Sequence, residues 1–246
     1  MRGCLVPTET LDSDSGRIEG GAAHHLRDVL RVREGEALAL FDGRGRRRPV
    51  RIAAVERKAL EFVAEGPAET LPAPRPDITL FQCIAKSARM DWLVEKAGEL
   101  GVTTLVPVQS AHCVGSHPEG ETVDRWRRLA ESALEQCGSA WVTAVAPVMH
   151  WKRAAEAMAA RPLVIVAALS PEARPFRETL MRLEDERGGI PAEVAIAVGP
   201  EGDFSPAELR QMLDAGAVPV SLGDRVLRTE TAALDAVAVV RAMWGG

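Results

Sequence analysis

Five short, mostly aliphatic segments constrain the fold of this chain more than any other feature. In chain order they are ITLFQC, TTLVPV, PLVIVAAL, EVAIAVG and VPVSLG, all in the C-terminal two thirds of the sequence. Runs of this length and composition are typical of strands that are buried on both faces of a sheet. Because helical patterns separate them, we predict an α/β domain with a mostly parallel sheet.

The helical patterns carry apolar residues at positions i, i+3, i+4 and i+7. In SARMDWLVEKAGELG the series ends at Gly101, and in DRWRRLAESALEQCG it ends at Gly138, as expected where glycine supplies a left-handed stop. In SPAELRQMLDAG, Ser205 and Glu208 have the spacing of a capping box at a helix N-terminus. Each of these segments is therefore predicted to be a helix.

A proline-rich segment separates this domain from the residues before it. GPAETLPAPRPD, residues 66–77, holds four prolines and shows no apolar periodicity, so it should run extended. Upstream, ALALFDG, VRIAAV and ALEFV alternate apolar and polar residues around short turns, which favours a small β-barrel with one helix at AAHHLRDVLRV. We predict a barrel domain over residues 1–72 and an α/β domain over residues 73–246.

Composition excludes several classes of protein. No apolar run approaches the ~20 residues that span a membrane, and the N-terminus lacks an apolar signal core, so we expect a cytoplasmic protein without a membrane partner. The four cysteines form no CxxC motif and have no histidine pair at ligand spacing. We therefore expect free thiols and no metal site.

The net charge of −5 argues against a nucleic-acid partner, but the charge is unevenly distributed. Residues 1–75 carry 13 Lys and Arg against 12 Asp and Glu, and RGRRRPVR concentrates arginine within this part. The cluster consists of Arg44, Arg46, Arg47, Arg48 and Arg51. It is either the solvated tip of a hairpin or a grip for phosphate, since guanidinium groups match phosphate oxygens.

The last three predicted strands are each followed by a polar or glycine-containing loop. In a parallel sheet ligands bind beyond the carboxyl ends of the strands, so SPEA, PEGDFS and DRVLRTET are expected to line one site. Gly199, Pro200 and Gly202 match neither a dinucleotide fingerprint nor a phosphate-binding P-loop. By itself, a turn of this kind before a helix is structural more often than functional.

GDRVLRTETAALDA, residues 223–236, places unusual polarity before an Ala- and Val-rich helix. Thr229 or Thr231 is expected to cap that helix, which leaves Arg228 and Glu230 in need of partners. Those partners are either each other, as a structural ion pair, or a ligand. The helix itself should be covered by the sheet or by a second subunit.

Two of these segments carry a resemblance to a known family. GPEGDFSPAEL at 199–209, followed by LGDRVLRTETAALDA at 222–236, resembles the paired signature of the RsmE family. KSARMDWLVEKAGELGV, EQCG and HHLRDVLRV with its FDG turn resemble further segments of that family, so the resemblance covers essentially the whole chain. Members are bacterial methyltransferases that modify N3 of a uridine in 16S rRNA.

The resemblance implies a fold, a cofactor and partners. The fold is an N-terminal PUA-like β-barrel followed by a SPOUT domain, whose C-terminal trefoil knot forms a pocket for S-adenosylmethionine. The protein would be a homodimer acting near the 3′ end of 16S rRNA, within the assembled small ribosomal subunit. The alternatives are a related methyltransferase for another RNA and a non-catalytic rRNA-binding assembly factor.

Carried over residue by residue, the resemblance also implies a cofactor site. It comprises Ala168, Leu169, Gly199, Pro200, Glu201, Gly202, Leu222, Gly223, Leu227, Arg228, Thr229 and Glu230. For catalysis, we hypothesise that Arg228 stabilises charge on the uracil oxygens and that Glu230 orients Arg228 or assists proton removal.

For the rRNA backbone, the expected contacts are the basic residues of the N-terminal domain. They are Arg2, Arg27, Arg31, Arg44, Arg46, Arg47, Arg48 and Arg51. This chain departs from the family pattern at Asp203, where a second glycine is frequent, and at His112 and Ser139, near which the family has arginines. The last two departures put in doubt the RNA contacts of those arginines.

Overall fold

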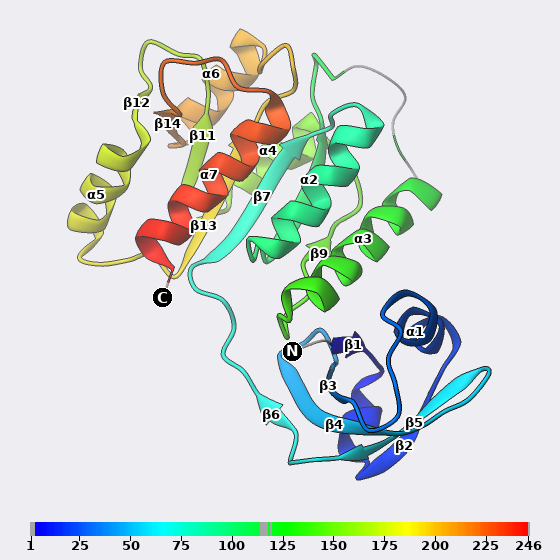
Figure 1. The fold of residues 1–246 in the computed structure, drawn as a ribbon. Coiled ribbons are helices and arrows are strands. Elements are labelled where there is room, and N and C mark those ends of the chain that lie inside the picture. The colour runs from blue at the N-terminus through cyan, green and yellow to red at the C-terminus, as the bar shows by residue number, and fades with distance from the viewer. Residues whose placement is uncertain (1–2, 114–117, 119, 246) are drawn as a thin grey trace. The chain divides into compact units, whose positions relative to one another are not determined.

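The computed structural model describes residues 3–113, 118 and 120–245, which divide into two compact units (Figure 1). The first unit comprises Met1–Ala73 and Glu131–Val142, and the second comprises Pro74–Ala130 and Thr143–Gly246. The return of residues 131–142 to the first unit has no counterpart in the sequence pattern. The domain boundaries and the functions of the two domains stay predictions.

The first unit is built on a six-stranded sheet. Its elements are β1 (Gly3–Leu5), η1 (Thr8–Asp12), β2 (Ser15–Glu19), α1 (Gly20–His24), η2 (His25–Val29), β3 (Ala37–Phe41), β4 (Arg46–Val55), β5 (Ala59–Ala64) and β6 (Glu69–Thr70). The strand order is β1-β3-β4-β5-β2, with β6 beside β4. Among the described strands of this sheet, β1 and β3 form the only parallel pair.

Alternation of apolar residues gives this sheet one buried face. Leu38, Leu40, Val50, Ile52 and Phe62 point into a shared core with apolar residues of α1 and η2. The predicted helix near residues 22–32 is therefore confirmed, although it widens into a π-helical turn at His25–Val29.

The second unit alternates strands and helices. Its elements are β7 (Asp77–Cys83), α2 (Ser87–Glu99), β8 (Thr104–Gln109), α3 (Glu121–Cys137, whose last turns belong to the first unit), β9 (Ala144–Val145), β10 (Met149–His150), α4 (Trp151–Ala159), β11 (Val164–Ala167), β12 (Arg174–Pro175), α5 (Phe176–Arg187), β13 (Glu193–Val198), α6 (Pro206–Asp214), β14 (Val218–Ser221) and α7 (Thr229–Trp244).

Its eight strands form a sheet in which every pairing is parallel. The order is β10-β8-β7-β13-β11-β14-β12, with β9 beside β8. This confirms the predicted α/β fold with a parallel sheet. Because β13, β11 and β14 are neighbours, the three polar loops that follow them leave from the same edge of the sheet.

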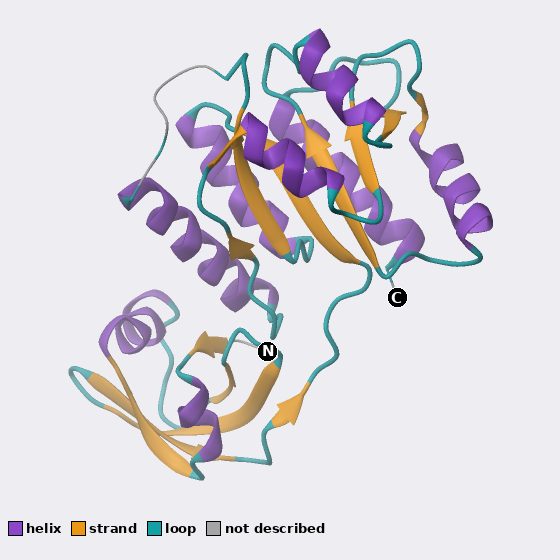
Figure 2. Cartoon of the chain, turned by 180° about the vertical axis from the view of Figure 1, so that it is seen from behind, coloured by secondary structure: helices purple, strands orange, loops and turns teal. Residues whose placement is uncertain are grey.

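Helices cover both faces of this sheet. Helices α2 and α7 lie on the face seen in Figure 1, and α4 and α6 lie on the face seen in Figure 2. Residues such as Ile165 and Ile196 are fully buried between these layers, as expected for aliphatic strands. None of the described helices is long and apolar enough to cross a membrane.

The predicted capping box begins α6. Ser205 accepts a hydrogen bond from the backbone N–H of Glu208, and the Glu208 carboxylate accepts one from the backbone N–H of Ser205. Glu208 also accepts from the backbone N–H of Ala111 at 2.9 Å. The start of α6, and with it the loop after β13, is therefore fixed by two separate segments of the chain.

Candidate functional site

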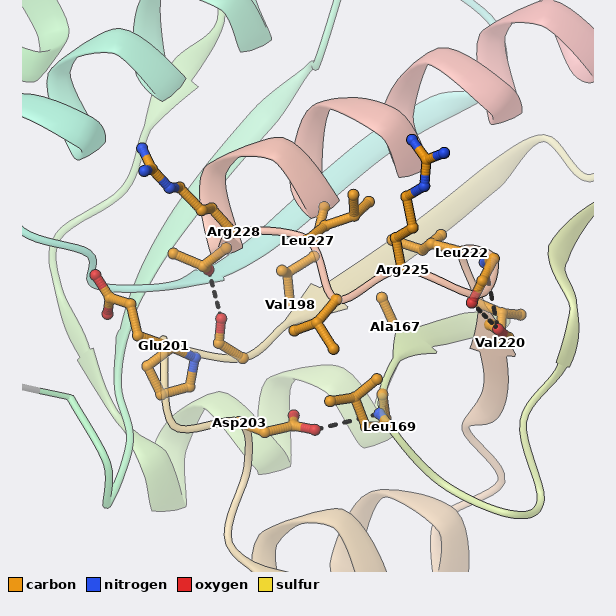
Figure 3. Close-up of a pocket in the computed structure, with 18 residues that line it drawn as sticks. Ala167, Leu169, Val198, Glu201, Asp203, Val220, Leu222, Arg225, Leu227 and Arg228 are labelled. Carbon is orange, nitrogen blue, oxygen red and sulfur yellow. Dashed lines mark hydrogen bonds between the residues drawn. The ribbon is translucent and has the colours of Figure 1, made fainter.

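The polar loops at the sheet edge enclose a pocket of about 280 Å³ (Figure 3). It is lined by Ala167, Ala168, Leu169, Val198, Gly199, Pro200, Glu201, Asp203, Val220, Ser221, Leu222, Gly223, Arg225, Val226, Leu227, Arg228, Thr229 and Ala232. All the predicted cofactor residues belong to this set except Gly202 and Glu230. The structure thus brings together segments that are about 20 to 60 residues apart in the sequence.

Several lining residues were not identified from the sequence. Three of them are the last residues of β11, β13 and β14, namely Ala167, Val198 and Ser221, and Val220 precedes Ser221. The rule that ligands bind beyond the carboxyl ends of parallel strands could have identified these residues. Arg225 stands in the polar loop before α7, where its charge gave a signal. Asp203 was seen only as a departure from a family pattern.

Thr229 ties the start of α7 to the loop after β13. Its hydroxyl donates a hydrogen bond to the carbonyl oxygen of Gly199 and accepts one from Gln82 Nε2 at 2.8 Å. The prediction that Thr229 or Thr231 caps α7 is therefore wrong: Arg228 is the N-cap residue, and its side chain caps nothing. Thr229 is buried, and its hydroxyl holds two pocket-forming segments together instead.

Glu230 does not pair with Arg228. Its Oε1 lies 3.6 Å from Arg89 Nε, and Arg89 Nη1 lies 2.9 Å from Glu201 Oε1 on the pocket wall. Arg89 on α2 therefore bridges two carboxylates, one at the pocket and one at the first turn of α7. The structural ion pair between Arg228 and Glu230, left open by the sequence, is not formed.

The two predicted catalytic side chains have opposite environments. Glu230 is only 6% exposed, and its Oε2 is buried without a hydrogen-bond partner among the described residues. Arg228 is exposed, and within the described part of the chain its guanidinium makes no hydrogen bond or ion pair. A buried, unsatisfied carboxylate oxygen costs free energy unless a ligand or water satisfies it.

Most of the predicted RNA-binding arginines have partners inside the first unit. Ion pairs join Arg46 to Asp12, Arg47 to Glu69, Arg48 to Asp14, Arg51 to Glu65 and Arg27 to Asp28. Arg48 is also buried and donates to the carbonyl oxygens of Leu11 and Gly66.

The remaining arginines of that set differ from these. Arg31 and Arg44 are exposed, and no side-chain partner is found for either among the described residues. Arg2 lies outside the described residues. Two free guanidinium groups on the first unit are thus left to meet a phosphate backbone, and the roles of all eight arginines stay predictions.

His112 and Ser139, where the sequence departs from the pattern of arginines expected from the resemblance, make local contacts. His112 Nδ1 lies 3.1 Å from the carbonyl oxygen of Gly202 and 3.0 Å from that of Asp203, so the ring braces the loop after β13. Ser139 accepts a hydrogen bond from the backbone N–H of Trp141 and donates one to its carbonyl oxygen. Both side chains stabilise turns of the chain itself.

Comparison with known proteins agrees with this geometry. Two family models match, an RNA methyltransferase PUA domain over residues 18–65 and an RNA methyltransferase domain over residues 72–241. The ribosomal RNA small subunit methyltransferase E of Mycobacterium bovis is 34% identical over 245 residues, covering 92% of this chain and 87% of that protein. The protein of the same name from Bacillus subtilis is 26% identical over 244 residues, covering 96% and 93%.

A solved structure shares the whole fold. The ribosomal RNA small subunit methyltransferase E from Neisseria gonorrhoeae, bound to S-adenosyl methionine, superposes with a TM-score of 0.84 and 31% identity, covering 100% of this chain and 98% of that one. These matches confirm the PUA-like domain and the SPOUT α/β domain, while the trefoil knot stays a prediction. The chain therefore belongs to the RsmE family of RNA methyltransferases.

Proposed function

We propose that this chain methylates N3 of a uridine near the 3′ end of 16S rRNA in the small ribosomal subunit, using S-adenosylmethionine. One observation carries the proposal: the loops after β11, β13 and β14 form one pocket, with an arginine on its wall that has no partner among the described residues and a buried carboxylate two residues further along the chain. Membership of the RsmE family supports the rRNA substrate.

The pocket fits the proposed cofactor. Its walls combine aliphatic side chains such as Val198 and Leu222 with backbone at Gly199 and Gly223, a mixture suited to an adenosine group. Gly223 has φ of 118°, a backbone conformation that residues with a side chain rarely adopt. The pocket wall therefore has no side chain at this position. When bound, the cofactor supplies a methyl group that its sulfonium sulfur has already activated.

Catalysis must act mainly on the methyl acceptor, uracil N3, because the methyl donor is already activated. Uracil N3 carries a proton at neutral pH, so that proton must leave as the N–CH₃ bond forms and the S–CH₃ bond breaks. Arg228 stabilises the negative charge that develops on the uracil carbonyl oxygens, for which its free guanidinium is available. Glu230 assists the removal of that proton, for which its Oε2 has no partner among the described residues, and Arg89 lies beside its other oxygen. The remaining contribution is alignment of donor and acceptor.

The chain is expected to act as a homodimer that binds rRNA in the cytoplasm. Half-buried Leu234, Ala238 and Val239 give α7 an apolar surface that the chain covers only in part, which supports a homodimer. The expected site of action is the cytoplasm, on the assembled small subunit. Phosphate contacts come from the basic residues of the first unit, with Arg31 and Arg44 free to make them.

A strain that lacks the gene provides the test. Mass spectrometry of its 16S rRNA is expected to show the loss of one 3-methyluridine near the 3′ end. The wild-type gene and an Arg182→Ala control restore the mark, because among the described residues Arg182 forms an ion pair with Glu186 alone, on the exposed side of α5. Arg228→Ala is expected to restore ~1% or less of the rate, as when a preorganised charge-stabilising donor is removed.

Three outcomes would contradict the proposal. An unchanged nucleoside pattern in the deletion strain would exclude this substrate, and loss of a mark from another RNA would favour a related methyltransferase. Full restoration by Arg228→Ala would exclude the role assigned to that arginine.

A further inference from the structure

Asp203 adopts a backbone conformation that glycine would adopt more easily. Its φ is 57°, in the left-handed region, and the only other described non-glycine residue with positive φ is Arg31. Most side chains are strained there, although Asp and Asn tolerate it better than others. Because Asp203 also lines the pocket, we expect contacts of its side chain to offset the backbone strain.

The Asp203 carboxylate joins two loops of the pocket. Oδ2 accepts a hydrogen bond from the backbone N–H of Leu169, in the loop after β11, at 3.2 Å. Oδ1 accepts one from the backbone N–H of Phe204, in its own loop after β13, at 2.7 Å. Figure 3 shows the hydrogen bond between Asp203 and Leu169 as a dashed line between two residues that line the pocket. Hydrogen bonds from N–H groups to a carboxylate are among the stronger ones in proteins.

The surroundings of Asp203 are shaped to this contact. A Cβ atom on Gly199 would lie 2.9 Å from Asp203 Oδ1, so the glycine leaves the space that the carboxylate occupies. On the other side, His112 contacts the carbonyl oxygens of Gly202 and Asp203. Among the described residues no cation forms an ion pair with Asp203, so backbone N–H groups are its only partners.

We propose that Asp203 is a positioning residue that fastens the loop after β11 to the loop after β13, and so shapes the cofactor pocket before the cofactor binds. The inference rests on the proposed function, because it takes S-adenosylmethionine as the ligand. The physical reason is preorganisation: loops ordered in advance lose less conformational entropy on binding, so affinity rises without any new contact to the ligand.

Replacing Asp203 by glycine should weaken cofactor binding without lowering the stability of the protein. Asp203→Gly removes the fastening but also removes the strain at positive φ, so the melting temperature should stay the same or rise. The dissociation constant for S-adenosylmethionine should increase about tenfold or more, as expected when hydrogen bonds to a charged group are lost. Asp203→Asn should fall between, because its amide tolerates this backbone and keeps a single, neutral oxygen acceptor.

Calorimetry with S-adenosylmethionine and amide hydrogen exchange on the full chain test this. Asp224→Asn is the matched control: Asp224 also stands in a loop beside the pocket but does not line it, and the same negative charge is removed. In cofactor-free Asp203→Gly, exchange at the Leu169 amide should accelerate about tenfold, while the Ile196 amide in the core should not change. The Asp224→Asn protein should match the wild type in both measurements.

Three results would overturn the inference. They are a dissociation constant within about twofold of wild type, unchanged exchange at Leu169, or a fall in melting temperature with faster exchange throughout the domain. If wild-type protein failed to bind S-adenosylmethionine, the proposed function would fail, whereas the exchange measurement would still decide whether Asp203 fastens the loops.

Discussion

At the scale of single residues, Arg89 connects the pocket to α7. Its guanidinium contacts Glu201 on the pocket wall and Glu230 in the first turn of the helix. Glu230 is almost fully buried, and Arg89 is the cation that lies beside its carboxylate. In the proposed mechanism, Arg89 therefore positions the carboxylate of Glu230, and the guanidinium of Arg228 interacts with the substrate.

Replacing Arg89 tests this division. Arg89→Met should lower the methylation rate constant by about tenfold or more, because the contribution of a positioned acid or base depends on its geometry. Binding of S-adenosylmethionine should change by less than about threefold, because Arg89 does not line the pocket. Arg89→Lys should recover part of the rate by restoring the cation.

Single-turnover kinetics and calorimetry measure the two effects separately. Lys96→Met is the matched control, since Lys96 lies on the same helix and also bridges two carboxylates, those of Glu95 and Glu99. A rate for Arg89→Met equal to that of Lys96→Met would show that Arg89 has no part in positioning Glu230.

The thiol of Cys113 is expected to react with alkylating reagents in a pH-dependent way. A hydrogen bond from the Cys83 thiol, with further ones from Ser110, lowers the pKa of Cys113 from 9.0 to about 6. Because the pKa is lowered, the thiolate is present above about pH 6, and its alkylation by iodoacetamide should level off by about pH 7.5. A thiol of ordinary pKa would still react faster with each step toward pH 9.

Mass spectrometry of the Cys113 peptide after alkylation at a series of pH values gives the inflection. Cys83→Ala removes the main hydrogen-bond donor and should move the inflection upward. An inflection above about pH 8 in the wild-type protein would contradict this account of the Cys113 environment.

At the scale of elements, α7 is fastened at both ends. Thr229 anchors its first turn, and Arg241 in its last turn donates to the carbonyl oxygens of Pro76 at 2.9 Å, Leu100 at 3.3 Å and Gly101. Leu100 and Gly101 immediately follow α2, so Arg241 satisfies carbonyl groups at the end of that helix. Burial of this cation lowers the pKa of Arg241.

Arg241→Met should therefore lower the free energy of unfolding by about 1–3 kcal/mol, because partly buried carbonyl groups lose their charged donor. Urea denaturation measures the change, with Arg182→Met on exposed α5 as the control. A loss no larger than that of the control would show that the three hydrogen bonds contribute nothing net.

The helices and strands show what local patterns can predict. Apolar periodicity identified α2, α3 and α6, and the capping box at Ser205 marked where α6 begins. The cap of α7 was mispredicted because the Thr229 hydroxyl turns to Gly199, a partner distant in the sequence. The periodicity of α3 runs unbroken through Glu131, so nothing local shows where the chain passes between the two units.

At the scale of the whole molecule, the candidate site could be predicted only in part. Polar loops after strands can be recognised one by one, but the order β13-β11-β14 that brings them together depends on long-range packing. The resemblance to the family indicated that these loops form one cofactor site, which the local sequence patterns alone did not establish. It did not supply Arg89 as the partner of Glu230 or the side-chain contact of Asp203, which arise from where α2 and the loop after β11 lie.

The charge of the first unit gives a prediction for RNA binding. Arg44 is free in the described structure and Arg48 is buried with acceptors, so the two should behave differently. Arg44→Ala should reduce the slope of log affinity against log salt by about 0.7–0.9, the value for one phosphate contact. Arg48→Ala should leave the slope unchanged and lower stability instead.

Filter binding of rRNA fragments across a series of salt concentrations measures both slopes, and thermal melts measure stability. Equal slopes for wild type and Arg44→Ala would remove Arg44 from the RNA interface. A reduced slope for Arg48→Ala with unchanged stability would show that Arg48 binds phosphate after all.

The proposed activity is the transfer of a methyl group from S-adenosylmethionine to N3 of one uridine in 16S rRNA. The most direct test incubates the purified protein with small ribosomal subunits that lack the mark and with cofactor carrying a deuterated methyl group. Mass spectrometry of the rRNA should find one labelled 3-methyluridine near the 3′ end, formed at ~1% or less of the wild-type rate with Arg228→Ala. Label at another base or another atom, or no label with the wild-type protein, would contradict the account.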